Sequence, residues 1–468
     1  MDDYLTSEAL EAPAAGAAPP EPHGARRAPD RFSDRLARWL FRALALLFVG
    51  GAFWCGTSLL DLLGSAGGWR GTSLQIARLL PPLTLTVVAL LSLATGAYRG
   101  ETRRLWYFAY GIAAFFIASI IAMWIALVRE PYRPPSDEVV IATPAQLDDF
   151  VRRRIWTSKL RVRGETPTFL PTGVFVKTTE FKDTENLFMS GYVWQKYTDG
   201  VDDSLTRGFV LPEAVDERIE EAYRRREGAR EKIGWKFEAE TRQLFHYDRF
   251  PFDVKDPWVR LWHTDFDRNV VLIPDLESYA STNPATRPGI ESRLVLPGWR
   301  IQQSFFSYKL HHYGTNFGVD AYQSRSDVPE LYFTIVAQRE FLSTFFLLLL
   351  PILVMLVLIF IIVYNMPPRQ LGGEGLYNIS RICGSYMFIL ILNHVNLRRY
   401  VSGGIVYLEY FYVVLYFGIL WVLLNAALYL KGLNPPGIRW RENLIAKLAF
   451  LPLLTGALLL VTYLTFRH

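Results

Sequence analysis

The sequence predicts a mixed membrane protein with three N-terminal transmembrane helices, an exterior β-rich domain and four C-terminal transmembrane helices. Three observations predict this class. Hydrophobic residues make up 51% of the 468 residues. They gather in seven long apolar runs, grouped as three and four, and a long polar segment separates the two groups.

Residues 1–36 are rich in Ala, Pro, Glu and Arg and contain almost no bulky apolar side chains. Such a composition cannot bury enough surface to offset the entropy of the chain. We therefore expect a disordered cytoplasmic tail. It does not have the basic and then apolar pattern of a signal peptide, so the first apolar run is expected to remain as an anchor.

Each of the seven apolar runs is long enough to cross a hydrocarbon core about 30 Å thick. The first three define a membrane domain over residues 37–130, and the last four define another over residues 341–468. The runs are Trp39 to Leu63, Leu79 to Tyr98, Leu105 to Val128, Phe341 to Tyr364, Leu376 to Asn393, Ile405 to Leu430 and Leu444 to Phe466.

Arginines in the short loops predict the orientation of these runs. Arginine clusters precede the first run and separate the second from the third, so both segments are expected in the cytoplasm. Three crossings then place residues 131–340 outside, in the periplasm if the membrane is a bacterial inner membrane, and four more place the C terminus outside. Only the Arg398-Arg399 pair opposes the rule. The cytoplasmic basic residues are Arg26, Arg27, Arg31, Arg35, Arg38, Arg99, Arg103, Arg104, Arg369, Lys431, Arg439 and Arg441.

The polar segment, residues 131–340, has the pattern of a β-sandwich. Between Thr172 and Asp199, β-branched and aromatic residues alternate on both sides of a short acidic turn, which predicts two paired strands. Short strands separated by turns are typical of a sandwich. From Pro212 to Arg230, however, glutamates and arginines recur at helical spacing, which predicts an exposed helix. Further strands are expected at Trp235 to Phe245, Val254 to His263, Val270 to Ile273, Trp299 to Lys309 and Leu331 to Ala337.

Several motifs follow one another through about two thirds of the chain. Phe250-Pro251-Phe252-Asp253 stands in the polar segment, Gly298-Trp299 follows it, and the strand ending at Arg339 leads into the fourth apolar run. In this order and spacing the chain resembles the pentameric ligand-gated ion channels, the Cys-loop receptor superfamily, in their cysteine-free prokaryotic form. The family usually has tryptophan where Tyr197 stands and glutamine where Lys255 stands. The first three membrane helices do not belong to the family's common core.

The resemblance implies that the base of the sandwich couples ligand binding to pore opening. Asp253, Arg339 and Asp183 are expected to meet there, and Arg398 and Arg399 are expected to find acidic partners at the same level. Removing one member of such a partly desolvated cluster leaves a charge without its partner. The alternative is a structural ion pair with no role in gating.

The fifth apolar run is polar on one helical face and apolar on the other. A mid-span arginine costs at least about 2.5 kcal/mol on insertion scales, so it should face water or a partner. The resemblance turns the polar face toward a five-fold axis, with a hydrophobic constriction at its outer end. The alternative pairs Arg381 with Glu409 inside a helix bundle that never conducts. The pore-lining residues are expected to be Glu374, Asn378, Arg381, Ser385, Phe388 and Leu392.

The resemblance also implies a ligand site between subunits, under the loop from Leu310 to Tyr322. Its aromatic candidates, Tyr313, Phe317 and Tyr322, would hold an amine by cation–π contact. The alternative for each ring is simple packing. The His311-His312 pair is too small a set for a metal site.

Other functions are not indicated by the sequence. It has no nucleophile constellation, phosphate loop or paired carboxylate motif, so neither an enzyme nor a cofactor is expected. Cys55 and Cys383, the only cysteines, both lie in apolar runs, so the exterior domain has no disulfide. The net charge of +5 reflects arginines near the membrane, and no nucleic-acid signature is present.

The sequence therefore predicts a homopentameric channel that passes inorganic ions when a small molecule binds outside, with membrane lipid as its surroundings. The alternative is a receptor of the same fold that conducts nothing and signals through a partner. A seven-span transporter is disfavoured because no internal repeat relates the three helices to the four.

Overall fold

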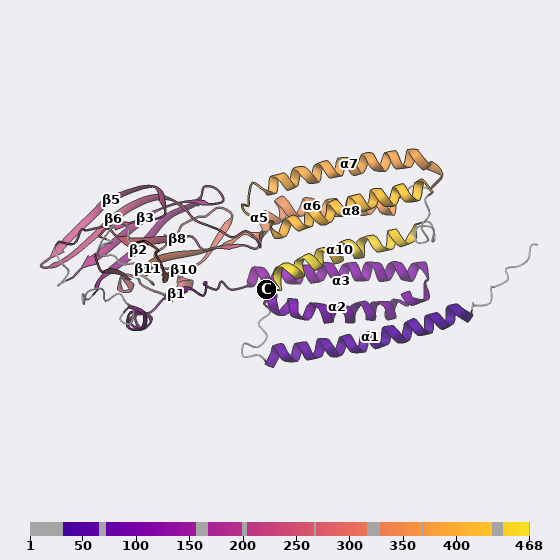
Figure 1. The fold of residues 1–468 in the computed structure, drawn as a ribbon, viewed down its shortest axis with the longest axis horizontal. Helices are drawn as coiled ribbons and strands as arrows, with labels where there is room; N and C mark the ends of the chain where they lie inside the picture. The colour runs from indigo at the N-terminus through magenta and orange to yellow at the C-terminus, as the bar shows by residue number, and fades with distance from the viewer. Residues whose placement is uncertain are drawn as a thin grey trace, which may run out of the picture.

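The structure is a computed structural model, and it describes residues 31–64, 72–155, 167–198, 204–265, 268–315, 328–366, 369–432 and 443–467. Seven long apolar helices lie side by side at one end of the molecule, and two β-sheets lie at the other (Figure 1). Helices of this length and composition indicate a multi-pass membrane protein.

All seven predicted runs are helical. In the C-terminal group, the first helix is continuous through a π-helical turn, and a short loop precedes the third helix. The helices are α1 (Arg31–Gly64), α2 (Ser73–Thr95), α3 (Thr102–Arg129), α5 (Phe341–Thr344) continuing through the π turn Phe345–Leu349 into α6 (Leu350–Tyr364), α7 (Gly372–Leu397), α8 (Tyr407–Leu430) and α10 (Leu444–Phe466). The expected tail is too long by its last six residues, because α1 already begins at Arg31.

Local signals explain both ends of α2. Thr72 and Gln75 form a reciprocal capping box at the start of α2, and Gly96 ends that helix in the left-handed conformation with φ +65°. Pro351 stands near the start of α6, directly after the π turn, and local π adjustments of this kind re-satisfy the backbone groups that a proline leaves free in a membrane helix.

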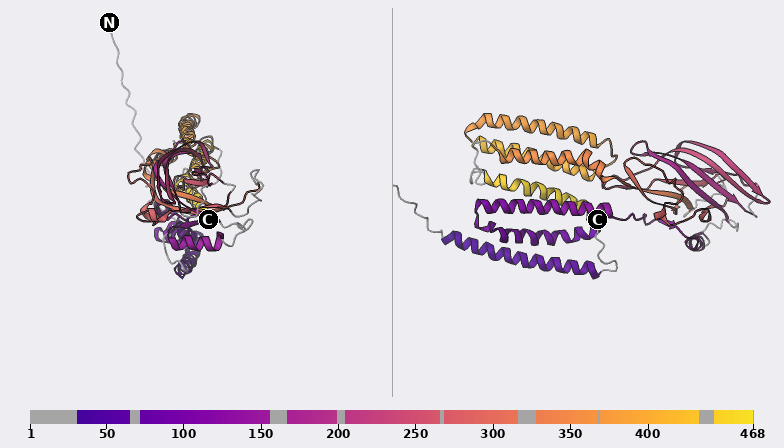
Figure 2. Two further views of the ribbon diagram at one scale, coloured as in Figure 1. Left: turned by 90° about the vertical axis from the view of Figure 1, so that its left-hand side faces the viewer. Right: turned by 180° about the vertical axis from the view of Figure 1, so that it is seen from behind.

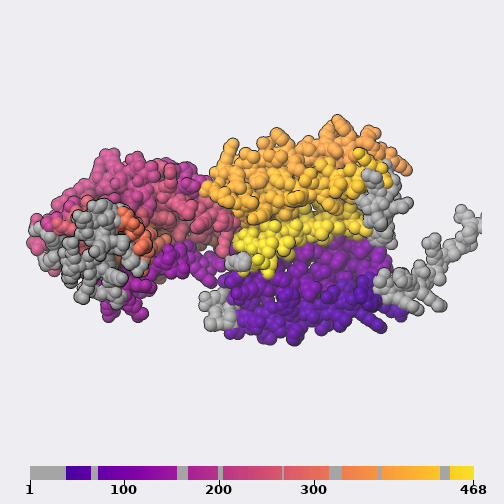
Figure 3. Space-filling view, in the orientation of Figure 1, coloured from indigo at the N-terminus to yellow at the C-terminus, as the bar shows by residue number. Residues whose placement is uncertain are grey.

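The helices are arranged so that α7 and α1 lie on opposite edges of the helical part (Figure 1). Between them, α6 and α8 lie beside α7, α2 lies beside α1, and α3 lies on the other side of α2. Helix α10 fills the middle and packs against both α3 and α8. In the space-filling view it forms a yellow band between the two groups (Figure 3). The three N-terminal helices therefore cover the side of the four-helix group that is farthest from α7.

The β-rich end contains two sheets. One has strand order β1-β10-β11-β8-β4 with β7 paired to β11, and the other has order β5-β6-β3-β2-β9. All pairs are antiparallel except β2 with β9. The strands are β1 (Glu138–Ile141), β2 (Thr168–Phe181), β3 (Asn186–Tyr197), β4 (Phe209–Val210), β5 (Ala214–Glu227), β6 (Arg230–Arg242), β7 (Val254–Lys255), β8 (Trp258–His263), β9 (Val270–Pro274), β10 (Trp299–His311) and β11 (Val328–Arg339).

The predicted strands are present, but the predicted helix is wrong. The stretch from Pro212 to Arg230 forms β5 and the turn into β6, not a helix. Its glutamates and arginines are exposed because β5 is the edge of its sheet, where charged side chains discourage pairing with another chain. Two smaller differences involve the run from Val254 to His263, which Pro257 divides into β7 and β8, and the short helix α4 (Pro144–Phe150), which was not predicted.

Two hydrophobic clusters account for most of the described core. One cluster joins apolar side chains of both sheets, including Val174 on β2 and Phe333 on β11. The other fills the space between the helices and also includes Phe250 and Phe252 from the β-rich end. The end of α10 lies at the same level, close to the sheets (Figure 2). The Phe-Pro-Phe-Asp segment is thus part of the helical core.

Candidate functional site at the junction of sheets and helices

Phe252 is the centre of the contact between the two halves of the molecule. Its ring lies 5.1 Å from that of Phe341, which begins α5, and 6.1 Å from that of Tyr407, which begins α8. Phe466, near the end of α10, and Trp124 on α3 are 6.2 and 5.9 Å away. One residue of the β-rich domain therefore contacts four helical segments. We call the set Phe250, Phe252, Asp253, Trp299, Arg339, Phe341 and Tyr407 the junction.

Asp253 and Arg339 form a buried, bidentate ion pair within the junction. The Nε and Nη2 atoms of Arg339 donate to the two carboxylate oxygens of Asp253 at 2.7 and 2.8 Å. The guanidinium also lies against the rings of Phe250 and Trp299, at 4.7 and 4.2 Å from their centroids. Since the side chain of Asp253 is 2% exposed, each charge depends on the other. The expected meeting of these two residues is present.

A main-chain hydrogen bond also crosses the junction. The N–H of Tyr407 donates to the carbonyl oxygen of Asp248 at 2.9 Å. The Tyr407 hydroxyl in turn contacts the indole N–H of Trp124 at 2.9 Å and the hydroxyl of Thr462 at 2.8 Å. These contacts connect α3, α8 and α10 to the segment before Asp253.

Asp183 does not join this pair among the described residues. Its carboxylate accepts hydrogen bonds from the backbone N–H groups of Glu185 and Asn186, at 2.8 and 2.7 Å, inside its own turn. These bonds hold the pKa of Asp183 below its ordinary value. The expected contacts of Asp183 with Asp253, Arg339 and the arginines after α7 are corrected accordingly, because the tight turn takes up the carboxylate locally.

Arg398 finds an acidic partner, but on a helix and not on the β-rich domain. Its Nε lies 2.5 Å from the Glu409 carboxylate, which is 2% exposed and also contacts His394 at 3.2 Å. Glu409 is therefore occupied, and the expected alternative in which it pairs with Arg381 is wrong. Arg399 is exposed and forms no ion pair within the described part of the chain.

All six expected pore-lining residues lie on the exposed side of α7 in the single chain. The opposite side carries Ile379, Cys383 and Leu390, which are buried against the neighbouring helices. Arg381 forms no ion pair with any described residue. The exposed side carries Glu374, Asn378, Arg381, Ser385, Phe388 and Leu392.

Of the expected ligand-binding rings, only Tyr313 lies among the described residues, and Phe317 and Tyr322 lie outside them. Asp199, at the end of the expected strand pair, and four of the arginines expected in the cytoplasm also lie outside them: Arg26, Arg27, Arg439 and Arg441. The Tyr313 hydroxyl donates to the buried Glu330 carboxylate at 2.5 Å. Arg260 neutralises that carboxylate at 3.1 Å. Burial and the carboxylate raise the pKa of Tyr313. The Tyr313 ring thus belongs to a polar cluster in which Arg260 supplies the cation.

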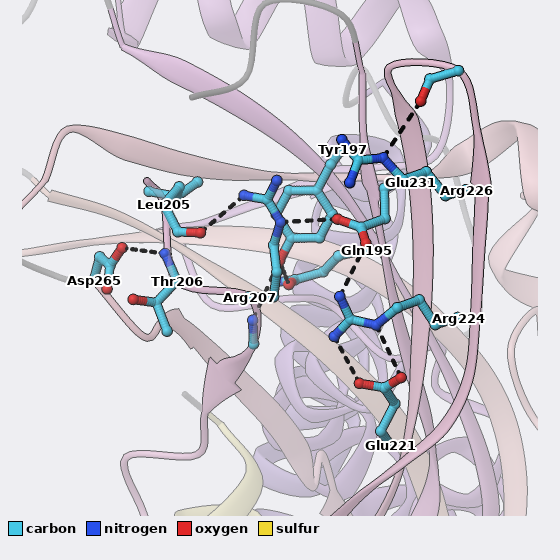
Figure 4. Close-up of polar contacts among 12 residues, drawn as sticks. Gln195, Tyr197, Leu205, Thr206, Arg207, Glu221, Arg224, Arg226, Glu231 and Asp265 are labelled. Atoms are coloured by element: carbon cyan, nitrogen blue, oxygen red, sulfur yellow. Dashed lines mark hydrogen bonds and ion pairs between the residues drawn. The ribbon is translucent and has the colours of Figure 1, made fainter. Parts of the chain in front are cut away.

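A second polar cluster lies at the far end of the sheets and contains Tyr197 (Figure 4). The Arg207 guanidinium lies 4.2 Å from the centroid of this ring and 3.1 Å from Glu231, which also binds Arg224 at 3.0 Å. Burial raises the pKa of Tyr197 to about 12. The arrangement anchors β3 to β6 and to the segment that precedes β4.

Lys255 was noted in the sequence analysis but was given no functional role. It is 3% exposed, and aromatic rings surround its ammonium. The signal was its position two residues after the Phe-Pro-Phe-Asp segment, where the family that the sequence resembles usually has glutamine. Trp124 was also missed, because nothing in its apolar run distinguishes it from its neighbours.

In comparisons with known proteins, no protein-family model and no curated protein matches the chain. Among the described residues, no group of three or more His, Cys, Asp or Glu side chains is placed to hold a metal ion. The junction and the exposed side of α7 are therefore the features that bear on function.

Proposed function

We propose that this chain is one subunit of a ligand-gated ion channel, with five copies around a central pore. In this proposal the two sheets form a ligand-binding β-sandwich in the periplasm of a bacterium, and the helices cross its inner membrane. The N terminus is cytoplasmic and the C terminus is outside. The proposal develops the resemblance described above and assigns the pore to α7.

The observation that carries the proposal is the exposed polar side of α7. Arg381 is exposed in the middle of α7, and α7 lies at the outer edge of the helical part (Figure 1). Facing hydrocarbon, it would cost at least about 2.5 kcal/mol. Facing a water-filled axis shared with other copies, it would remain hydrated. A ring of Glu374 at one end and Phe388 with Leu392 toward the other would then give the passage a charged mouth and an apolar constriction.

The junction supports gating by an exterior ligand. Asp253 and Arg339 join the loop before β7 to the strand that runs into α5, and Phe252 contacts the starts of α5 and α8. A rotation of the sheets would therefore move the segments on either side of α7. The ligand itself is proposed to be a small molecule that binds near the β10–β11 connection, and the passing ions are inorganic.

Recording from purified full-length protein in planar bilayers tests conduction. Arg381→Ala and Glu374→Gln each remove a ring of charge, so the rectification or the ion selectivity of the current should change. A charged thiol reagent should block Ser385→Cys, made with Cys55 and Cys383 replaced by alanine. Met387→Cys, on the opposite side of the same helix, is the matched control and should not be blocked.

Equal block of Met387→Cys would remove the assignment of the pore-lining side. Absence of current across ligand and pH screens would favour the second candidate, a receptor that signals through a partner. One observation supports that candidate: Trp124 connects the N-terminal helices directly to the junction. A signal could leave the junction by this route without any ion flow.

A further inference from the structure

A pocket opens beside the junction, near the point where β11 leads into α5. Its volume is about 410 Å³, within the range of roughly 300 to 1,000 Å³ that is usual for small-molecule sites. The stretch from Leu294 to Ile301 forms most of its wall, and Arg287 and Glu340 complete it. The charged residues of the described wall are Arg287, Arg300 and Glu340, and all of them are exposed. We call it the boundary pocket.

Two connections place the boundary pocket where membrane-crossing helices end. The N–H of Glu340 donates to the carbonyl oxygen of Gly298 at 2.9 Å, and the residue after Glu340 is the first of α5. On the other side of the wall, Nη2 of Arg300 donates to the side-chain oxygen of Gln338 at 3.0 Å. The side-chain nitrogen of Gln338 donates in turn to the carbonyl oxygen of Val128, in the last turn of α3, at 2.8 Å. The pocket therefore lies at the level where α3 ends and α5 begins.

The charges of the wall match those of a phospholipid headgroup. Among the described residues, Arg287, Arg300 and Glu340 form no ion pair. Guanidinium groups bind phosphate through parallel N–H bonds, so the two arginines are suited to a phosphate. The carboxylate of Glu340 would repel a further anion and would accept hydrogen bonds from an ammonium group. A ligand that carries a phosphate and an ammonium group would satisfy all three side chains.

Apolar side chains beside these charges favour a lipid over a soluble ligand. Val295, in the wall, is 78% exposed, and Leu342, two residues after Glu340, is 69% exposed. A small soluble ion would leave both side chains in water. The acyl chains of a lipid would cover them, and burial of apolar surface is what holds amphiphilic groups at a membrane boundary.

We propose that the boundary pocket binds the headgroup of an ethanolamine phospholipid. The phosphate contacts Arg287 and Arg300, and the ammonium group contacts Glu340. Trp299 belongs both to the wall and to the junction, where Arg339 packs on its ring at 4.2 Å. A lipid in the pocket therefore lies beside the junction. This inference requires that the helices cross a membrane, and it does not require conduction.

The first test measures binding to delipidated full-length protein in detergent. Phosphatidylethanolamine is titrated in, native mass spectrometry counts the bound lipids, and Tm is recorded, since a ligand that binds only the folded state raises Tm. Arg287→Asn and Arg300→Gln should each weaken binding by about tenfold. Asparagine suits position 287, where φ is +57°, because it tolerates the left-handed conformation while removing the charge.

Arg293→Gln is the matched control for both variants. Arg293 is exposed on the same segment, directly before the wall begins at Leu294. It should keep the affinity of the wild type. Equal weakening in Arg293→Gln would mean that surface charge attracts lipid in general, and the assignment of the pocket would be overturned.

The second test examines the choice of headgroup. The wild type should bind phosphatidylethanolamine about tenfold more tightly than phosphatidylglycerol, which offers Glu340 no ammonium group. Glu340→Gln should remove most of this difference, and it retains the main-chain bond to Gly298. Equal affinity of the wild type for the two lipids would refute the ethanolamine headgroup.

Soluble glycerophosphoethanolamine separates a lipid from a free ligand. It should not raise Tm at concentrations at which the lipid saturates, and an equal rise would overturn the lipid assignment. If no lipid binds, and Arg287→Asn or Arg300→Gln lowers the number of chains in the particle, another copy of the chain covers the pocket and the proposal is wrong. None of these readouts involves current, so a failure of the proposed channel would leave them unchanged.

Discussion

Two ion pairs in this protein show how burial changes the contribution of an aspartate–arginine contact to stability. Asp253 and Arg339 are 2% and 13% exposed and exchange two hydrogen bonds. Asp149 and Arg153 on α4 and the turn after it are 51% and 78% exposed, although their contact is as short, at 2.6 Å. Solvent screens the second pair, so its contribution to stability should be small.

Asp253→Asn should therefore be much more destabilising than Asp149→Asn. The first change leaves the guanidinium of Arg339 buried without its counter-charge, which costs roughly 3 to 5 kcal/mol. The second should cost less than about 1 kcal/mol. Thermal unfolding of the detergent-solubilised variants measures both. Equal shifts in Tm would contradict the view that the junction pair is desolvated.

The sequence could predict the pairing of Asp253 with Arg339, because one ends a turn motif and the other ends the strand that enters the first helix of the C-terminal group. It could not predict the partner of Asp183. The N–H groups of Glu185 and Asn186 are two and three residues away and lie within reach of its short side chain. Local hydrogen bonds therefore occupy this carboxylate in place of a long-range partner.

At the scale of the element, β5 shows why charge spacing alone misleads. Glutamate and arginine at intervals of three and four are favourable on a helix, but they also fit a strand whose two faces are both exposed. What decides the outcome is β6, which has alternating buried side chains and pairs with β5 along its length. Pairing with a neighbour is not visible in the local pattern of β5.

Helix α3 is expected to influence the junction through Trp124. Trp124→Phe keeps an aromatic ring beside Phe252 but removes the hydrogen bond to Tyr407, so it should cost about 0.5 to 1.5 kcal/mol of stability. It should also shift the midpoint of activation. Trp106→Phe serves as the control, because Trp106 packs on Tyr364 at the other end of α3. Dose–response curves and Tm values measure both effects.

An equal shift in activation for Trp106→Phe would mean that α3 acts through general stability and has no special connection to the junction. The role of Trp124 was not predictable, since the pattern of an apolar helix does not reveal which neighbour it packs against in a membrane. The packing of α3 on α10, together with the contacts of Trp124 to Phe341 and Phe411, places its ring beside Phe252.

At the scale of the whole molecule, the number and order of the seven helices were predictable from hydropathy, and their lateral arrangement was not. The arrangement separates two surfaces. The polar side of α7 lies at one edge, and α1, with apolar side chains such as Phe53 75% exposed, lies at the other. If α7 faces an axis, α1 faces lipid.

This separation leads to a prediction about assembly. Native mass spectrometry from detergent should find particles with five times the 53.6 kDa mass of one chain. Replacement of exposed residues of α1, such as Phe53→Leu, should not change the number of chains in the particle, because the exposed side of α1 is expected to contact lipid and no other copy. A particle that contains a single chain, or one whose mass falls in the α1 variant, would contradict the arrangement around α7.

The bond from the N–H of Tyr407 to the carbonyl oxygen of Asp248 is made entirely by the main chain. Side chains at both positions can therefore vary over evolutionary time without breaking it, with proline at position 407 as the exception. Divergent relatives of this chain should keep that mechanical attachment even where the aromatic residues around it have been replaced.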